Sequence, residues 1–414
     1  MSDSPHADGT SATLSSVGRQ LVLWSAFLGW MFAGVEMQLV PLATRSAITS
    51  FVADGTLAIP AAVAQKEVIG KWFVHYIAAF LLGAALGGLV FGWLGDRSGR
   101  TKAMGLSILW YSLFTGLGYW ATDANQLLVL RFVACMGIGG MWPNGVALVA
   151  EAWPDVSRPA LAGLIGAAAN VGITVLGVIS RLHPLTADSW RWLMLVCATP
   201  ALLGLFVLWW VPESPRWLAG RTSHGNGARA VPAAEVFRPP LLRLTLFGIV
   251  LGTIPLLGAW GASKWYVLWA DRIGAELGQL NLKSDAQIVW GVGASIGSLA
   301  GGWLASRLGR RASYFLVSLG SVLISAYLFR ASTPGYNFPF MAAVFLLGLI
   351  PTVYFGWLPF YLPELFPTRV RATGAGVAFN FGRIISAAVT LSSFVFLALY
   401  QGREKEIGAG GSMV

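Results

Sequence analysis

Long apolar stretches alternate with short polar ones along the whole chain. A helix that crosses a bilayer needs about 20 mostly apolar residues, so each stretch predicts one membrane-spanning helix. The eleven predicted spans are Leu21–Leu42, Trp72–Gly95, Ala103–Trp120, Gln126–Ala150, Ala160–Ile179, Trp192–Val211, Leu244–Ala270, Ile288–Ala305, Ala312–Phe329, Phe338–Leu362 and Ala372–Tyr400. The pattern therefore predicts an all-α polytopic membrane protein.

The composition agrees with a lipid environment. Only 11% of the 414 residues are charged and 56% are hydrophobic, whereas a soluble domain carries about 25% charged residues. So few charges cannot cover a surface that faces water. We expect the lipid bilayer to surround most of the chain.

The net charge of +10 comes from loops that alternate along the chain. The basic loop residues are Arg97, Arg100, Lys102, Arg158, Arg216, Arg221, Arg229, Arg238, Arg243, Arg307, Arg310, Arg311, Arg369 and Arg371. The loops between these are mixed in sign. Since Lys and Arg accumulate on the cytoplasmic side, this pattern predicts a cytoplasmic N-terminus in the inner or plasma membrane. The charge reports topology, and we expect no nucleic-acid partner.

The longest polar interruption, residues 212–243, follows the sixth span and is rich in Gly, Pro and Arg. It predicts a central cytoplasmic loop. The domains expected are an N-terminal six-helix half (1–211), this loop, a C-terminal half with five evident spans (244–400) and a polar tail (401–414).

Two pairs of loop segments match each other across these halves. Gly92–Arg100 reads GWLGDRSGR and Gly302–Arg310 reads GWLASRLGR. Glu151–Gly163 and Glu364–Gly376 share Glu, Pro, Arg and Gly at the same spacing. The matches indicate a duplicated six-helix unit, and such repeats around a central site are a transporter architecture.

Three cytoplasmic segments resemble motifs of the major facilitator superfamily. Gly92–Lys102 resembles its signature loop between helices two and three. Pro212–Leu218 resembles the sugar-porter motif that closes helix six. Pro363–Gly374 is similar to the motif after helix ten in sugar porters, organic-ion carriers and aromatic-acid:proton symporters. The resemblance covers nearly the whole chain and implies a major facilitator fold of two six-helix pseudo-repeats.

The chain departs from that family in the number of spans. The family has twelve and only eleven are evident here. Residues 401–414, after Tyr400, are polar and Gly-rich. We expect the last helix to be missing, through natural loss or truncation.

The resemblance implies a cytoplasmic gate built from the motif charges. In the first half, Asp96 is expected at the start of helix eleven, and Arg97 and Arg100 are expected to pair with Glu151. Pairs that form in one state and break in the other make a bistable element; the alternative is that these charges only set topology. The gate residues assigned are Gly92, Asp96, Arg97, Gly99, Arg100, Glu151, Arg158, Glu213, Arg216, Arg307, Arg310, Glu364, Arg369 and Arg371.

In the second half, Arg307 and Arg310 are expected to pair with Glu364, with Glu213 nearby. Ser306 stands where the first half has an acid, so the gate is expected to be asymmetric.

Two charges in the predicted spans suggest proton coupling. Glu36 lies in span one and Arg131 in span four, before Gly137, Gly139 and Gly140. Charge inside a membrane is costly and marks function by default. We expect Glu36 to load and release a proton beside the fixed charge of Arg131. The alternatives are a structural ion pair, or an Arg131 that reaches the headgroups.

Two further cations suggest a substrate site. Lys264 lies in span seven, near Trp260 and Trp265, and an aromatic cage beside a cation suits a carboxylate or an aromatic compound. Asn380 and Arg383 in span eleven resemble the Asn-x-x-Arg region of aromatic-acid:proton symporters. Arg recognises carboxylates with a two-pronged fork. The alternatives are an interfacial Lys and a helix-packing Arg.

Glycines recur at helical spacing in spans two and eight, at Gly83, Gly87, Gly88, Gly92, Gly293, Gly297, Gly301 and Gly302. Small faces of this kind let helices pack closely in lipid. Pro143 and Pro359 are possible helix breaks, although membrane helices tolerate Pro.

No nucleotide-binding loop, zinc-ligand spacing or nucleophile elbow is present, so we expect no cofactor, no metal and no enzyme. The function expected is secondary active transport by alternating access: a monomer that moves a small organic anion, such as an aromatic or other carboxylic acid, together with a proton. A proton-coupled or facilitative sugar porter is one alternative. A non-transporting membrane sensor on the same fold is another, and a channel fits the gate charges less well.

Overall fold

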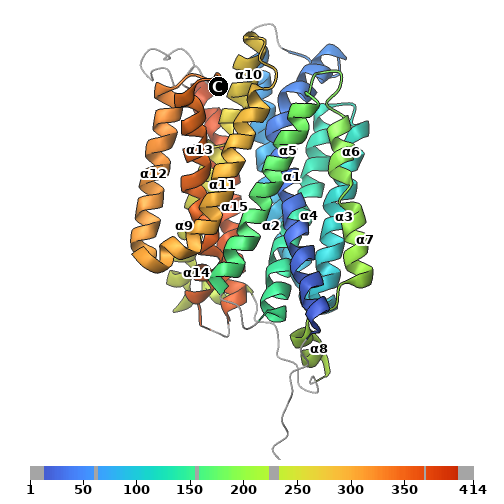
Figure 1. The fold of residues 1–414 in the computed structure, drawn as a ribbon, viewed down its shortest axis with the longest axis vertical. Coiled ribbons are helices and arrows are strands. Elements are labelled where there is room, and N and C mark those ends of the chain that lie inside the picture. The colour runs from blue at the N-terminus through green and yellow to red at the C-terminus, as the bar shows by residue number, and fades with distance from the viewer. Residues whose placement is uncertain (1–13, 60–63, 154–157, 223–232, 368–369, 400–414) are drawn as a thin grey trace, which may run out of the picture.

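The computed structural model describes residues 14–59, 64–153, 158–222, 233–367 and 370–399. These ranges are helical almost throughout and contain no β-strand. Ten of their helical segments are long and apolar enough to cross a membrane. An eleventh, α3, has 18 residues and packs against α4 and α7 within the same bundle (Figure 1). The prediction of an all-α polytopic membrane protein is confirmed.

The helices before the central loop form what we call the N-terminal bundle, and those after it the C-terminal bundle (Figure 1). The first comprises α1 (Ser16–Ala53), α2 (Gln65–Ser98), α3 (Arg100–Leu117), α4 (Ala124–Ala152), α5 (Arg158–Leu182), α6 (Trp192–Ala198) and α7 (Ala201–Trp210). The second comprises α9 (Leu241–Leu256), α10 (Trp265–Glu276), α11 (Leu282–Leu308), α12 (Arg310–Ala331), α13 (Phe338–Thr352), α14 (Leu358–Glu364) and α15 (Arg371–Leu399).

Several helices extend well past the predicted apolar spans. The first runs over 38 residues and the second over 34, because backbone hydrogen bonding continues after the apolar stretch has ended. The prediction of a missing last helix concerns the chain after Leu399, which lies outside the described residues, as does the polar tail 401–414.

Three predicted spans are interrupted helices. Span six divides into α6 and α7 just before Pro200, which has no N–H to continue the helix. Span seven divides at a π-helical turn, η3 (Leu257–Ala262), and span ten at a 3₁₀ turn, η4 (Val353–Gly356). The prediction of a break at Pro143 is wrong because this residue lies inside a continuous α4. Pro359 follows the break and sits in the first turn of α14.

The matched loop segments adopt matching backbone geometry. Gly99 separates α2 from α3 with φ of 112°, and Gly309 separates α11 from α12 with φ of 80°. Only glycine adopts such angles without a steric penalty. Two further contacts repeat: the guanidinium of Arg97 lies 5.3 Å from the Trp93 ring centroid, and that of Arg307 lies 5.2 Å from the Trp303 centroid.

Glycine faces bring the helices of each bundle together. A Cβ atom built on Gly87 of α2 would lie 1.8 Å from the carbonyl oxygen of Met136 on α4. One built on Gly297 of α11 would lie 2.1 Å from the carbonyl oxygen of Leu349 on α13. The packing role predicted for these faces holds for most members, but Gly92 has no atom within 4 Å of its built Cβ.

The two bundles meet along α5 against α11 and along α2 against α15. The central loop contributes α8 (Pro215–Thr222) and the short 3₁₀ turn η2 (Ala233–Phe237). In Figure 1 α8 projects below the N-terminal bundle. We call the end of the molecule with Gly99 and Gly309 the Gly99 end, and the opposite end, where α10 finishes, the Asp271 end.

Candidate functional site

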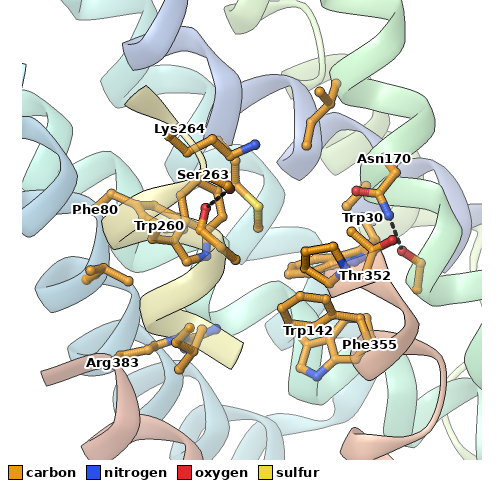
Figure 2. Close-up of a pocket in the computed structure, with 18 of the residues that line it drawn as sticks. Trp30, Phe80, Trp142, Asn170, Trp260, Ser263, Lys264, Thr352, Phe355 and Arg383 are labelled. Atoms are coloured by element: carbon orange, nitrogen blue, oxygen red, sulfur yellow. Dashed lines mark hydrogen bonds between the residues drawn. The ribbon is translucent and has the colours of Figure 1, made fainter. Parts of the chain in front are cut away.

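A cavity of about 90 Å³ lies between the two bundles. Aromatic side chains make up much of its wall: Trp30, Phe80, Trp142, Trp260, Trp290, Phe355 and Phe379. Asn170, Ser263 and Thr352 are among the few neutral polar groups in the lining. Figure 2 shows Lys264, Trp260 and Arg383 along one side, with Trp142 and Phe355 opposite. A largely apolar cavity with few polar groups is typical of a small-molecule site.

Two cations line this cavity, and both are buried. Lys264 is 1% exposed and Arg383 is 7% exposed. Lys264 donates to Gln38 Oε1 at 2.9 Å, while Arg383 donates to the carbonyl of Ala84 at 2.9 Å. Among the described residues, neither cation has a carboxylate in salt-bridge range, and no Asp or Glu lines the cavity. The cavity therefore carries uncompensated positive charge.

The sequence predictions for this site are met in part. Lys264, Trp260 and Arg383 line the cavity, but Trp265 and Asn380 do not. Trp265 packs edge-on against Phe73, with the ring centroids 4.9 Å apart.

Asn380 instead supports Arg383, because its Oδ1 accepts a hydrogen bond from Nη1 at 3.2 Å. The ring nearest the Lys264 ammonium belongs to Trp290, whose centroid lies 3.7 Å away, against 5.2 Å for Trp260.

Two polar residues missed by sequence reasoning lie beside the cavity, and the first of them, Asn170, connects the bundles. Asn170 of α5 donates to Ser298 Oγ at 2.9 Å and to the carbonyl of Ala294 at 3.2 Å, both on α11. Thr352 also donates to the Ala294 carbonyl, at 3.0 Å. A lone Asn or Thr in a span carries no charge to mark it, so the only available signal was its polarity.

The predicted pairing of Glu36 with Arg131 is present. Glu36 is fully buried and Arg131 is 2% exposed; Arg131 Nη1 lies 2.9 Å from Glu36 Oε2. Thr115 donates to the same oxygen at 2.7 Å. The other carboxylate oxygen, Oε1, is buried and has no hydrogen-bond partner among the described residues, so it is available to take a proton.

This pair lies apart from the central cavity. Glu36 is not among the residues that line the cavity, whereas its neighbour Met37 is. Arg131 touches a separate, small cavity of about 10 Å³ on the other side of α1. The Glu36–Arg131 pair and the central cavity therefore lie on different sides of α1.

Polar contacts join the bundles at the Asp271 end. Lys283 of α11 lies 3.0 Å from Asp271 of α10 and donates to the carbonyl of Leu42 on α1 at 3.4 Å. Arg45 of α1 lies 3.8 Å from the same Asp271 oxygen. Both charges of the closer pair are buried, which makes the pair sensitive to the loss of either partner.

A second ion pair closes this end beside the first. Arg181 of α5 lies 2.6 Å from Asp285 of α11, and Tyr336 donates to the other oxygen of Asp285 at 2.7 Å. The hydroxyls of Ser180 and Ser284 lie 2.7 Å apart and are buried. Arg181 and Asp285 lie in the loops of mixed sign, which the sequence analysis used only to assign topology, so this contact was missed.

We expect Lys283→Met to open the Asp271 end, because it removes the ammonium that joins Asp271 to α1. The measurement is the rate at which a maleimide labels Ser180→Cys in purified protein, against a background in which Cys135 and Cys197 are buried. Labelling is expected to accelerate about tenfold, which corresponds to about 1.4 kcal/mol in the opening equilibrium. Arg272→Ala, which breaks a pair within α10 alone, should leave the rate unchanged. Equal rates in both variants would contradict the prediction.

At the Gly99 end, the N-terminal bundle does not form the expected pairs. Arg100 lies 2.7 Å from Asp96, which is largely exposed, instead of pairing with Glu151. The prediction that Asp96 caps helix eleven is therefore not what the structure shows. Glu151 accepts a hydrogen bond from Ser214. Asp96 lies near the end of α2 and Arg100 begins α3, so the turn at Gly99 brings the two side chains together.

Glu213 is placed differently from its prediction. Both of its carboxylate oxygens accept from the backbone N–H of Thr101, at 3.1 and 3.2 Å. It therefore caps the N-terminus of α3, where the helix dipole favours an anion, and it does not join Arg307 and Arg310. Arg216 lies exposed on α8.

The C-terminal bundle keeps one expected pair. Arg310 lies 2.5 Å from Glu364, while Arg307 stacks on Trp303. Arg371 begins α15. Arg369 and the side chain of Arg158 lie outside the described residues, so those two predictions have no structural outcome. The ion pairs described at this end stay within one bundle, whereas Arg45–Asp271 and Arg181–Asp285 at the Asp271 end cross between the bundles.

Comparison with known proteins gives one family. The family model described as Major Facilitator Superfamily matches residues 72–390. A cis,cis-muconate transport protein of Acinetobacter baylyi is 29% identical over 77% of this chain and 76% of its own length. A niacin transporter of the same organism is 26% identical over 88% of this chain and 84% of its own.

Solved structures agree on the fold. The crystal structure of a D-xylose-proton symporter superposes with a TM-score of 0.70 and covers 95% of both chains. The sequence identity is 18%, so this likeness establishes the fold alone. The match extends over both bundles and over the cavity between them.

Proposed function

Since this chain belongs to the Major Facilitator Superfamily, whose members among its relatives are metabolite transporters and not enzymes, we propose that it is a proton-coupled symporter of a small organic anion. The observation that supports an anionic substrate is the pair of buried cations, Lys264 and Arg383, in a cavity whose described lining holds no carboxylate. An uncompensated cation in a low-dielectric site favours an anionic ligand.

The apolar walls narrow the class of anion. Aromatic rings flank both cations, and the Phe80 and Trp260 ring centroids lie 4.4 Å apart beside Lys264. Flat, conjugated carboxylates pack well against such rings. The names of two relatives, a muconate transporter and a niacin transporter, point to the same chemistry. Benzoate, nicotinate and cis,cis-muconate are therefore the first compounds to test.

The buried acid supports coupling to protons. Glu36 is held by Arg131 and Thr115 and keeps one oxygen free of hydrogen bonds among the described residues. Arg keeps its proton throughout, so Glu36 is the member of the pair that exchanges a proton during the cycle. The proton gradient then drives uptake of the substrate into the cell.

The orientation and the cycle follow from charge and contacts. The basic loops lie at the Gly99 end, which we assign to the cytoplasm together with the N-terminus. The cross-bundle ion pairs, Arg181–Asp285 and Arg45–Asp271, then close the outer side. For substrate to enter from outside, these pairs must break while contacts at the Gly99 end form, which is alternating access by a monomer.

We expect proteoliposomes with an imposed inward proton gradient to accumulate at least one of benzoate, nicotinate and cis,cis-muconate, and not D-xylose. The gradient drives uptake because each anion enters with a proton. A protonophore should collapse the accumulation to equilibrium. Accumulation of xylose alone would favour the sugar-porter alternative. Acid uptake that ignores the gradient would leave a uniporter, and binding without flux would leave a sensor.

A further inference from the structure

An interrupted helix positions Lys264. The π-helical turn Leu257–Ala262 ends α9, and Lys264 is the last residue before α10 begins. Insertions of this type occur often at functional sites. Here the interruption turns the Lys264 side chain toward α1 and α11 rather than toward lipid, and the side chain is 1% exposed.

The ammonium of Lys264 is poorly satisfied for a buried cation. It can donate three hydrogen bonds, but its only described hydrogen bond goes to Gln38 Oε1 at 2.9 Å. The faces of Trp290 and Trp260 supply the remaining contacts, at 3.7 and 5.2 Å. None of these partners is an anion, so the described contacts do not compensate a positive charge on Lys264.

Two buried donors next to this ammonium have no acceptor among the described residues. One is Nε2 of Gln38, whose side chain is fully buried; the other is Nε1 of Trp290, whose side chain is 4% exposed. Nine in ten buried polar groups are hydrogen-bonded, and an unmet donor destabilises the fold. Two donors without acceptors lie beside an ammonium that makes one of its three possible hydrogen bonds. Together they indicate that an acceptor is absent.

We infer that the carboxylate of the transported anion binds at Lys264, with the Gln38 amide and the Trp290 indole N–H as its additional donors; this rests on the proposed function. One ammonium and two N–H groups match the acceptor capacity of a single carboxylate. Trp290 lines the cavity, so the substrate body extends along the aromatic walls toward Arg383. Neither Gln38 nor Trp290 was singled out in the sequence.

This placement gives α1 two functions on two faces. Glu36 faces Arg131 on α4, and Gln38, two residues later, faces Lys264. Positions two apart on a helix point to nearly opposite sides. Substrate at Lys264 contacts both members of the Lys264–Gln38 hydrogen bond, which joins α1 to the C-terminal bundle.

The test is equilibrium binding of radiolabelled benzoate, nicotinate and cis,cis-muconate to purified protein, each beside its neutral carboxamide. Trp290→Phe replaces the indole with a smaller aromatic ring that has no N–H. Gln38→Leu removes both the oxygen and the nitrogen of the amide. We expect each to weaken acid binding about tenfold, and Gln38→Glu to abolish it by neutralising Lys264. Carboxamide binding should change less than about threefold.

Trp190→Phe is the matched control, because Trp190 is also a buried tryptophan whose N–H has no described partner, but it lies outside the cavity. If wild type binds an acid and the Gln38 and Trp290 variants bind it equally well, the carboxylate sits elsewhere and the inference fails while the proposed function stands. If wild type binds none of the acids, both fail. Should Gln38→Leu not fold, Trp290→Phe decides alone.

Discussion

Replacement of Glu36 with Gln is expected to abolish gradient-driven accumulation of the organic acid, by at least about 100-fold, while exchange of internal for external substrate continues. Gln keeps the shape of the side chain and one oxygen that accepts from Arg131 and Thr115. It cannot take up or release a proton. During exchange, the protein carries substrate in both directions without gaining or losing a proton. The substitution therefore stops only the net uptake that the proton gradient drives.

The measurement compares two assays in the same proteoliposomes: uptake driven by an inward proton gradient, and counterflow with equal pH on both sides. Glu276→Gln is the matched control, because Glu276 is an exposed acid paired with Arg272 on its own helix. It should behave as wild type in both assays. Full gradient-driven uptake by Glu36→Gln would remove Glu36 from the coupling mechanism and leave a structural ion pair.

Loss of both activities in Glu36→Gln would mean damage to the fold. Breaking a buried pair by removing one partner destabilises by about 3–5 kcal/mol, since Arg131 would stay buried without its counter-ion. A double variant, Glu36→Gln with Arg131→Met, removes both charges and tests this. Recovery of folded protein in the double variant would assign the defect to the unpaired arginine.

Gly87→Ala is expected to have the largest effect on stability. Its Cβ would lie 1.8 Å from the carbonyl oxygen of Met136, a distance that real atoms do not reach. Gly139 on the facing helix is just as close, at 2.0 Å from the carbonyl of Ala84, so α2 and α4 cannot shift together to make room. Overpacking of this kind destabilises by about 1–3 kcal/mol, and more where backbone is the obstacle.

The readout is the midpoint of thermal unfolding in detergent, together with the yield of monodisperse protein. Gly70→Ala on the same helix is the matched control, since no atom lies within 4 Å of its built Cβ. Replacing an unhindered helical Gly with Ala stabilises by about 0.5–1 kcal/mol, so the two variants should move the midpoint in opposite directions. A Gly87→Ala midpoint at or above that of wild type would contradict the close α2–α4 contact.

The sequence alone determined the membrane fold and its repeat. A run of about 20 apolar residues is a local property, and lipid forces each such run into a helix. The same holds for Gly99 and Gly309, whose turns follow from glycine itself. The Glu36–Arg131 pair was also predictable, because two opposite charges inside a membrane gain most from finding each other.

Tertiary structure decided which side chains meet. Gln38, Trp290 and Asn170 look like any other residues of an apolar span, and only helix packing shows that they face the cavity or the opposite bundle. Asp271 and Lys283 lie outside the predicted spans, yet the ends of α10 and α11 bury them against α1. Arg100 pairs with Asp96 across the turn at Gly99, and Glu213 caps the N-terminus of α3. Hydropathy and motif spacing fix position along a helix, whereas the direction of a side chain depends on how each helix rotates against its neighbours.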